Sequence, residues 1–381
     1  MNTSQFQSNS NLGILGGGQL GKMLLVEAGK LGMHVAVMDP SPSAPCASSS
    51  GRFIVGDIQD YDAVIEFGRD LDVLTVEIEH VNVDALESLQ ADGVAVHPDP
   101  AILRVIQNKA GQKDFYRSRG LPTVDYRRFD SLVEIDRSTL TFPIVWKAAT
   151  GGYDGRGVSV LRSEKDMDGL PDVPGYLETY LGRSRELAVI VGRNVAGEAA
   201  VFPPVEMDFH PVANLVEMIH CPADIPDEIG VDAERIGIAI ANKLKLVGVL
   251  AIELFYTADG ELFVNESAPR PHNSGHLTIE GNMTSQYAQH LRAILGLPLG
   301  DTSIRTPSAM INLVGAKGHT GSPVYNGLAE VMAEPGVFVH LYGKAETRPF
   351  RKMGHVTVVG TDEVEIRAKA QFVRETLTIT A

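Results

Sequence analysis

The chain has 381 residues, and its 33 Lys and Arg against 48 Asp and Glu give a formal net charge of −15. We expect two or three domains, because this length exceeds one ordinary hydrophobic core. The acidic balance disfavours general nucleic-acid binding, although local basic pockets stay available to anions. Two cysteines exclude a disulfide-rich scaffold, and no apolar run reaches the length of a membrane span. We therefore expect a cytoplasmic globular protein with a disordered polar tail over residues 1–10.

Short apolar runs alternate with helical patterns through residues 11–105, which predicts a doubly wound domain around a parallel sheet. The runs "NLGIL", "HVAVMD", "VLTVEIE" and "GVAVHP" predict buried strands, and "GQLGKMLLVEAGKLG" and "YDAVIEFGRD" predict helices. In the first turn, Gly16, Gly18 and Gly21 fit G-x-G-x-x-G, and Asp39 follows 18 residues after Gly21. Such a turn can receive a pyrophosphate and such an acid a ribose. One hypothesis is therefore an NAD-dependent oxidoreductase.

The pattern changes after Pro100. Residues 101–120 predict one helix, and "PIVWKAAT", the glycine-rich "GGYDGRG" and "VSVLRS" together predict a strand–loop–strand hairpin. A P-loop or Rossmann loop leads into a helix instead. "DAERIGIAIANKLKL" predicts a helix, and the segments on either side of Asp259 and Gly260 predict a second hairpin. Residues 305–381 predict a small unit of short strands with a helix near 362–375.

The second hairpin carries two carboxylates. If its turn centres between Asp259 and Gly260, Glu253 lies opposite Glu266. Facing carboxylates repel each other and cost stability unless a cation lies between them. Oxygen ligands suit Mg²⁺, which usually also binds substrate phosphates. Because the register is uncertain by one residue, the alternative that one carboxylate points to solvent stays open.

Three further stretches hold side chains suited to anions. The glycines of "TGGYDGRG" let backbone N–H groups approach phosphates, with Lys147 nearby. "NESAPRPHNSGH" suits an anion-binding loop better than a zinc site, because no helix is expected between His272 and His276. "YGKAETRPFRKMGH" is a cationic cluster, either a solvated face or a phosphate subsite.

Together these stretches resemble the ATP-grasp superfamily, through Lys109, Lys147, "GGYDGRG", the Glu178 and Glu186 pair, Glu253 and Asn265–Glu266. Within it, "TGGYDGRG", "APRPHNSGH" and "RPFRKMGH" are similar to the N5-carboxyaminoimidazole ribonucleotide synthetase family, and the resemblance covers about residues 11–360. It implies a mixed α/β and α+β architecture. A Rossmann-like substrate-binding domain spans 11–105, an ATP-grasp domain 106–304, and a small strand-rich C-terminal domain 305–381.

The resemblance implies a ligase of purine biosynthesis. ATP phosphorylates bicarbonate to carboxyphosphate, and the exocyclic amine of 5-aminoimidazole ribonucleotide captures the carboxyl carbon, or CO₂ released from it. Such phosphoryl transfer needs positioning and charge neutralisation more than covalent catalysis. ATP and Mg²⁺ are the implied cofactors and a homodimer the implied assembly. The glycine turn of residues 16–21 then receives the phosphorylated substrate on exposed helix N–H groups, and Asp39 need not contact a ribose.

The resemblance also assigns residues. Mg²⁺ falls to Glu253 and Glu266. The bicarbonate site falls to Arg270, His272, Asn273 and Ser274. The ribonucleotide falls to Gln19, Leu20, Glu79, Tyr153, Asp154, Arg156, Lys344, Arg351 and Lys352. The ATP site falls to Lys109, Lys147, Gly152, Tyr153, Asp154, Gly155, Arg156, Gly157, Glu178, Thr179, Tyr180, Leu181, Glu186, His210, Asn265 and Glu266.

Position 268 is Ala, where many ATP-grasp enzymes carry a second metal-binding Asn, so Asn265 or water must complete the metal shell. Within the superfamily, the alternative is the formate-dependent glycinamide ribonucleotide ligase, which shares the spacing of Lys344 and Arg351–Lys352 but has a Ser-rich loop in place of "GGYDGRG". A catalytically silent nucleotide-binding protein is a third hypothesis, which the retention of both Glu253 and Glu266 disfavours.

Overall fold

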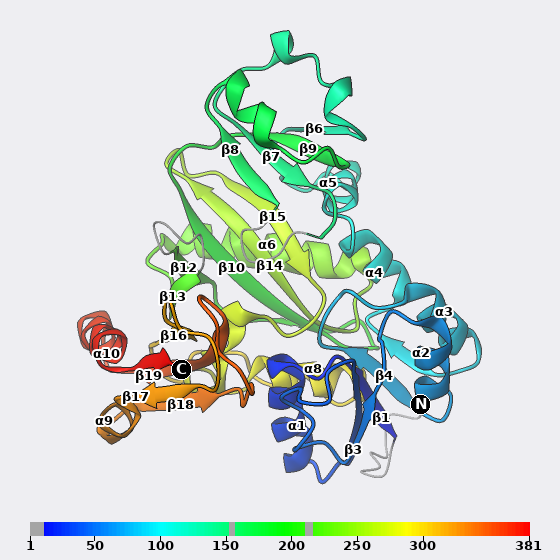
Figure 1. Ribbon diagram of the computed structural model, residues 1–381, viewed down its shortest axis with the longest axis vertical. Helices are drawn as coiled ribbons and strands as arrows, with labels where there is room; N and C mark the ends of the chain where they lie inside the picture. Colours follow the sequence, from blue (N-terminus) through cyan, green and yellow to red (C-terminus); the bar gives the residue numbers. More distant parts are fainter. Residues whose placement is uncertain (1–10, 152–156, 210–215) are drawn as a thin grey trace.

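The computed structural model describes residues 11–151, 157–209 and 216–381. Figure 1 shows an upper lobe, a long central sheet, and two lower units that contain the first and last parts of the chain. Among the described residues, no helix combines the length and the apolar character that crossing a membrane requires.

The N-terminal unit is a parallel sheet with helices on both faces, as predicted. Its strand order is β3-β2-β1-β4-β5. One face packs against α1 and the later helix α8, and the other against α2 and α3. The elements are β1 (Leu12–Leu15), α1 (Gln19–Lys30), β2 (Val35–Asp39), β3 (Arg52–Val55), α2 (Tyr61–Gly68), β4 (Val73–Val76), α3 (Val83–Ala91) and β5 (Ala95–His97). The edge strand β3 was not predicted, because both its end residues are exposed and it lacks a continuous apolar run.

The helix predicted over residues 101–120 is two helices, α4 (Pro100–Ile106) and α5 (Lys109–Ser118). The prediction missed the break because it ignored Asn108, whose side chain accepts a hydrogen bond from the Gly111 N–H and so caps α5. As a result, α5 begins at Lys109.

The upper lobe is an antiparallel sheet in the order β6-β9-β7-β8. The predicted hairpin is confirmed, because β7 pairs with β8 and Lys147 lies opposite Val158. The lobe contains β6 (Tyr126–Phe129), η1 (Leu132–Glu134), η2 (Arg137–Thr139), β7 (Ile144–Ala148), β8 (Val158–Leu161), η3 (Glu164–Gly169) and β9 (Gly175–Thr179).

The central sheet has nine strands in the order β15-β14-β10-β12-β13-β16-β19-β18, with β11 paired to β10. Helix α6 packs on β10 and β14 through an apolar core. The elements before residue 300 are β10 (Ser184–Arg193), β11 (Ala199–Val201), β12 (Val205–Phe209), β13 (Val216–Cys221), α6 (Asp227–Leu244), β14 (Gly248–Thr257), β15 (Leu262–Ala268), η4 (Asn273–Gly275), α7 (Thr278–Gly281) and α8 (Gln286–Ile294).

The strands after residue 305 extend this same sheet, because β16 pairs with β13. They also form a core of their own with the closing helix α10, and β17 and β20 make a separate two-stranded sheet. The elements are β16 (Ser308–Val314), β17 (Val324–Asn326), α9 (Leu328–Ala333), β18 (Val337–Leu341), β19 (Lys352–Val359), α10 (Glu363–Thr376) and β20 (Thr378–Thr380).

Candidate active site

The hairpin of β14 and β15 carries the predicted carboxylate pair, and Glu253 does lie opposite Glu266. The predicted pairing is correct because two deviations from the predicted hairpin cancel each other. Tyr256 pairs with Leu262, so the turn is centred half a residue earlier than predicted. A β-bulge then leaves Asn265 without a partner on β14 and restores the expected register at Glu253. The bulge thus brings Glu253, Asn265 and Glu266 to one place.

Lysines from two other elements reach this hairpin. The Nζ of Lys109, in the first turn of α5, lies 2.5 Å from Glu266 Oε2. The Nζ of Lys147, on β7, donates to Asn265 Oδ1 at 2.9 Å. Burial and the Glu266 charge raise the pKa of Glu253, whereas Lys109 outweighs burial and lowers the pKa of Glu266. One carboxylate is therefore compensated by the chain, and the other is not.

The predicted adenine-side acid, Glu178, pairs with Lys147 and with a further lysine, Lys113. It is 2% exposed on β9, and its Oε2 lies 2.6 Å from Lys147 Nζ, while Lys113 pairs with its other oxygen. The two lysines outweigh burial and lower the pKa of Glu178. Glu186, on β10, is charged less readily, because burial raises its pKa to about 7.

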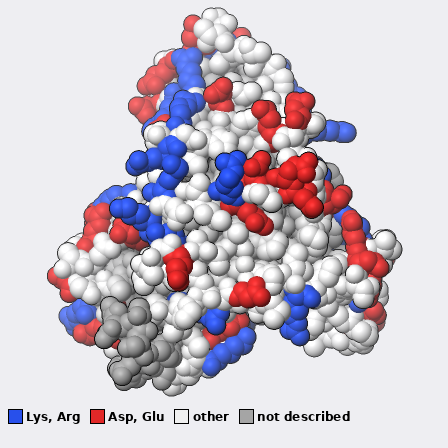
Figure 2. All heavy atoms as spheres, turned by 180° about the vertical axis from the view of Figure 1, so that it is seen from behind, with Lys and Arg blue, Asp and Glu red and all other residues white. Residues whose placement is uncertain are grey.

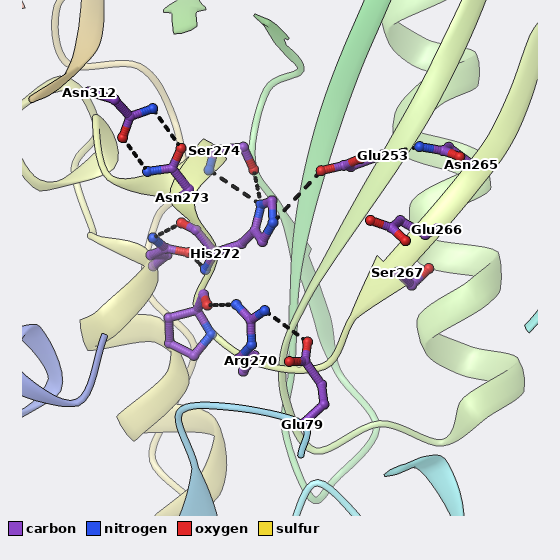
Figure 3. Close-up of polar contacts among 12 residues, drawn as sticks. Glu79, Glu253, Asn265, Glu266, Ser267, Arg270, His272, Asn273, Ser274 and Asn312 are labelled. Carbon is purple, nitrogen blue, oxygen red and sulfur yellow. Dashed lines mark hydrogen bonds and ion pairs between the residues drawn. The ribbon is translucent and has the colours of Figure 1, made fainter. Parts of the chain in front are cut away.

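The loop of residues 270–274 approaches the carboxylates from the other side (Figure 3). His272 Nε2 lies 3.7 Å from Glu253 Oε1, and burial, with Arg270 and Lys352, lowers the pKa of His272 to about 3. The Ser274 N–H donates to His272 Nδ1 at 3.3 Å. The neutral ring therefore carries its proton on Nε2, on the side of Glu253.

Two further contacts fix this loop. Arg270 forms an ion pair with Glu79 of the N-terminal unit at 2.9 Å and donates to the Pro271 carbonyl (Figure 3). Asn273 and Asn312, on β16, exchange side-chain hydrogen bonds of 2.9 and 3.0 Å. The loop thus links the N-terminal unit, through Glu79, and strand β16, through Asn312, to the neighbourhood of the two carboxylates.

The cationic cluster of residues 344–352 lies near this loop, since the charge of Lys352 contributes to the lowered pKa of His272. Lys344 Nζ donates to the Lys352 carbonyl at 2.7 Å, and Arg351 donates to the Glu346 carbonyl. Lys22 of α1 donates to the carbonyls of Leu341 and Tyr342, which brings the helix of Gln19 and Leu20 beside the cluster. On the face drawn in Figure 2, Lys and Arg side chains also form local clusters, although the net charge of the chain is negative.

The glycine turn differs from its expectation. The N–H groups of Gly18 and Gly21 donate to the Glu77 carboxylate at 2.8 and 2.9 Å, and the Gly17 N–H donates to Asp39 Oδ2 at 2.7 Å. The expectation of N–H groups open to a phosphate is therefore wrong at these three glycines. A Cβ on Gly18 would lie 2.5 Å from Glu77 Oε1, so glycine is needed here for the protein's own carboxylate. This arrangement also disfavours the dinucleotide hypothesis.

Some predicted site residues lie outside the described ranges, namely Gly152, Tyr153, Asp154, Gly155, Arg156 and His210. Gly157 precedes β8, with its carbonyl accepting from the Ala148 N–H. Thr179 is exposed at the end of β9, and Tyr180 and Leu181 are half-buried after it.

The hairpin fits a divalent cation. Two carboxylates face each other, the amide of Asn265 lies beside them, and burial with the neighbouring carboxylates raises the pKa of Glu253. Across residues 11–151, 157–209 and 216–381, no three His, Cys, Asp or Glu side chains gather into a metal cluster. The chain therefore offers a partial oxygen shell of the kind that suits Mg²⁺ with nucleotide phosphates.

Sequence reasoning missed Gln112, Lys113 and Asn312. Lys113 follows Lys109 by four residues, so helical periodicity could have placed both lysines on one face. Asn312 had no comparable signal, because it meets Asn273 only through strand pairing far along the chain.

Three domain families match this chain. They are the ribonucleotide synthetase preATP-grasp domain over residues 10–107, the ATP-grasp domain over 114–287, and the phosphoribosylaminoimidazole carboxylase C-terminal domain over 308–369. The mixed α/β ATP-grasp architecture that the resemblance implied is thereby confirmed.

Relatives match over nearly the whole chain. The N5-carboxyaminoimidazole ribonucleotide synthetase of Thermotoga maritima is 40% identical, with a TM-score of 0.89 and coverage of 98% of this chain and 99% of that one. The Aspergillus clavatus synthase, solved with ADP and 5-aminoimidazole ribonucleotide, is 32% identical, with a TM-score of 0.87 and coverage of 97% and 99%. The chloroplastic phosphoribosylaminoimidazole carboxylase of Vigna aconitifolia is 38% identical over 96% of this chain, which spans 66% of that protein's length.

Proposed function

The chain belongs to the N5-carboxyaminoimidazole ribonucleotide synthase family, and on that basis we propose that it carboxylates 5-aminoimidazole ribonucleotide through the site described above. It is an ATP-dependent ligase of purine biosynthesis that forms a carbon–nitrogen bond. The observation that carries the assignment of the site is the Glu253 and Glu266 pair, with lysines on one side and the loop of residues 270–274 on the other.

Lys109 and Lys147 bind the ATP phosphates in this proposal. In this structure Lys109 forms an ion pair with Glu266. Lys147 forms an ion pair with Glu178 and donates a hydrogen bond to Asn265. Triphosphate oxygens offer the same lysines more negative charge. Glu178, Thr179, Tyr180 and Leu181 line the adenine side, and Glu186 the ribose side.

Glu253, Glu266 and Asn265 hold Mg²⁺. The ion supplies charge neutralisation at the phosphate oxygens. The chain's own part is to keep the two carboxylates facing one point, which the bulge at Asn265 accomplishes. Lys109, which pairs with Glu266 in this structure, would contact the phosphates when a cation is bound at the hairpin.

Bicarbonate is the proposed carboxyl donor. A bicarbonate oxygen attacks the γ-phosphorus, the bond to ADP breaks, and carboxyphosphate forms. Arg270 stabilises its oxygens with fixed N–H donors. His272 donates at Nε2 rather than accepting a proton there, since its Nδ1 already accepts from the Ser274 N–H. His272 therefore positions an anion instead of acting as a base at Nε2.

The ribonucleotide binds between α1 and the cationic cluster. Lys344, Arg351 and Lys352 bind its 5′-phosphate, because the N–H groups of Gly18 and Gly21 are occupied by Glu77. Gln19, Leu20 and Glu79 line the same space. The exocyclic amine then attacks the carboxyl carbon, and phosphate leaves.

Release of ADP tests this proposal. The purified chain is supplied with Mg-ATP and bicarbonate, with and without 5-aminoimidazole ribonucleotide, and separately with glycinamide ribonucleotide and formate. We expect ADP only with the aminoimidazole substrate. ADP formed only with the second pair would keep the fold but overturn the chemistry assigned to residues 270–274.

Two finer points belong to the same proposal. We expect a homodimer, which sedimentation of the purified chain tests directly. A cytoplasmic site of action agrees with Cys46 and Cys221, which are both free and buried.

A further inference from the structure

Helix α5 presents polar side chains on a face that is buried against β15. Gln112 is 3% exposed, Lys113 0% and Tyr116 1%. Burial of an ammonium group is costly unless its charge and its hydrogen bonds are satisfied. The contacts of this face therefore indicate what the helix does.

Two of these side chains bracket the bulge. Strand β15 is at the edge of the central sheet, so its outer backbone groups have no neighbouring strand. The Ser267 N–H donates to Gln112 Oε1 at 2.9 Å, and Lys113 Nζ donates to the Val264 carbonyl at 3.1 Å. Asn265 and Glu266 are the two residues between these fixed points.

Lys113 also joins the central sheet to the upper lobe. Besides the Val264 carbonyl, its Nζ contacts Thr123 Oγ1 at 3.0 Å and pairs with Glu178 of β9. An ammonium group has three N–H donors, and here three acceptors from three segments surround it. Glu178 in turn contacts Lys147, which donates to Asn265.

We infer that Gln112 and Lys113 are positioning residues, which hold the bulge of β15 and the Glu178 carboxylate so that Asn265, Glu266 and Lys147 face the nucleotide. This inference rests on the proposed function, which makes those three residues ligands of the phosphates and the cation. Residues that orient metal ligands from behind have a measurable share in binding. Without Lys113, the Val264 carbonyl keeps only the longer hydrogen bond from Thr123 Oγ1, at 3.3 Å, and Glu178 keeps only Lys147.

The test compares Lys113→Met and Gln112→Leu with the control Tyr116→Phe, which removes a hydroxyl from the same buried face. Tyr116 OH contacts Gln112 and Ser267 Oγ, but neither the β15 backbone nor Glu178. Isothermal titration calorimetry with Mg-ADP measures binding of the nucleotide without turnover.

We expect Lys113→Met and Gln112→Leu to weaken Mg-ADP binding and raise the KM for Mg-ATP by about tenfold to a hundredfold, the range for such supporting residues. The KM for the ribonucleotide stays unchanged, and so does Mg-ADP binding by Tyr116→Phe. Unchanged binding in both test variants would overturn the inference. So would equal weakening in Tyr116→Phe, because the effect would then follow from a loosened helix.

If Lys113→Met does not fold, Lys113→Gln keeps a donor for the Val264 carbonyl without the charge. We expect partial Mg-ADP binding from it, and binding equal to the unaltered chain would overturn the role of the charge. Absence of ribonucleotide-dependent ADP release by the unaltered chain would refute the proposed function instead. The calorimetric titration with Mg-ADP keeps these two failures apart.

Discussion

The glycine turn and the β14–β15 hairpin are two regions where carboxylates meet groups of opposite charge, and they differ in whether the chain completes the match. At the turn, Glu77 accepts from two backbone N–H groups and is near Arg270, although burial still raises its pKa. At the hairpin, Lys109 compensates Glu266, while Glu253 keeps a raised pKa. Both oxygens of Glu77 are used by the turn's own N–H groups, whereas Glu253 faces a second carboxylate, Glu266. We therefore propose the hairpin, and not the glycine N–H groups, as the ligand site.

The largest effect is expected from Glu266→Gln. The amide keeps the shape but removes the charge that holds the cation, so we expect turnover to fall by about a hundredfold or more. Ribonucleotide-dependent ADP release measures this. Glu261→Gln, at the exposed turn of the same hairpin, is the matched control and should retain activity. Full activity of Glu266→Gln with Mg²⁺ would contradict the assignment of Glu266 as a ligand of the cation.

Lys352→Ala tests where the phosphate binds. Because the turn is closed by Glu77, the cationic cluster must supply the phosphate site, and loss of one charge-assisted contact should raise the ribonucleotide KM by about tenfold. The KM for ATP should not change. Lys317→Ala, in the same C-terminal unit, provides the control. An effect confined to the ATP KM would mean that the cluster has been assigned to the wrong substrate.

Glu77→Gln tests the turn itself. The amide has one acceptor oxygen, so one of the two glycine N–H groups loses its partner, and the free energy of unfolding should fall by about 1–3 kcal/mol. Urea denaturation measures that loss, and Asp92→Asn, at an exposed carboxylate of the same unit, serves as the control. Because the proposed cation site lies on the hairpin and not at the glycine N–H groups, the metal requirement should be unchanged. A changed Mg²⁺ requirement, or nicotinamide nucleotide binding by the unaltered chain, would argue that the turn receives a ligand.

The smallest effect concerns acid stability. The Val249 N–H donates to His290 Nδ1, and His290 Nε2 contacts Thr75 Oγ1. Burial lowers the pKa of His290 to about 3, below its unfolded value near 6.5. The unfolded chain therefore binds the proton first, and stability present above pH 6.5 is lost as the pH falls toward 3.

His290→Gln removes this one titration. Its stability at neutral pH should drop, but its further loss between pH 6.5 and 5.5 should be smaller than that of the unaltered chain by about 1 kcal/mol. Denaturation at the two pH values gives the difference, and His34→Gln, at an exposed histidine, is the control. Equal acid losses in both chains would contradict the buried neutral state of His290.

Local pattern predicted most elements of the fold and failed where tertiary contacts decide. The apolar runs of β1, β2, β4 and β5 can be recognised in the sequence, whereas β3 is an edge strand with exposed residues. The Glu253 and Glu266 pairing was predicted from the turn, but the bulge at Asn265 that produces it was not. No sequence rule places an unpaired residue so far from the turn.

The site shows the same division. Motifs picked out Lys109, Lys147 and Arg270, which the fold brings around one hairpin. Glu77 escaped notice because its role depends on reaching back to a turn 59 residues earlier. The assignment of individual residues to ATP, bicarbonate and ribonucleotide stays a prediction until the variants are measured.

The most direct test of the comparison between turn and hairpin is the binding of Mn²⁺ in the presence of ADP, measured by electron paramagnetic resonance. Mn²⁺ takes oxygen ligands as Mg²⁺ does and can be observed without turnover. We predict tight binding by the unaltered chain and by Glu77→Gln, and its loss in Glu266→Gln. Binding that survives in Glu266→Gln, or disappears in Glu77→Gln, would contradict the assignment of the hairpin as the ligand site.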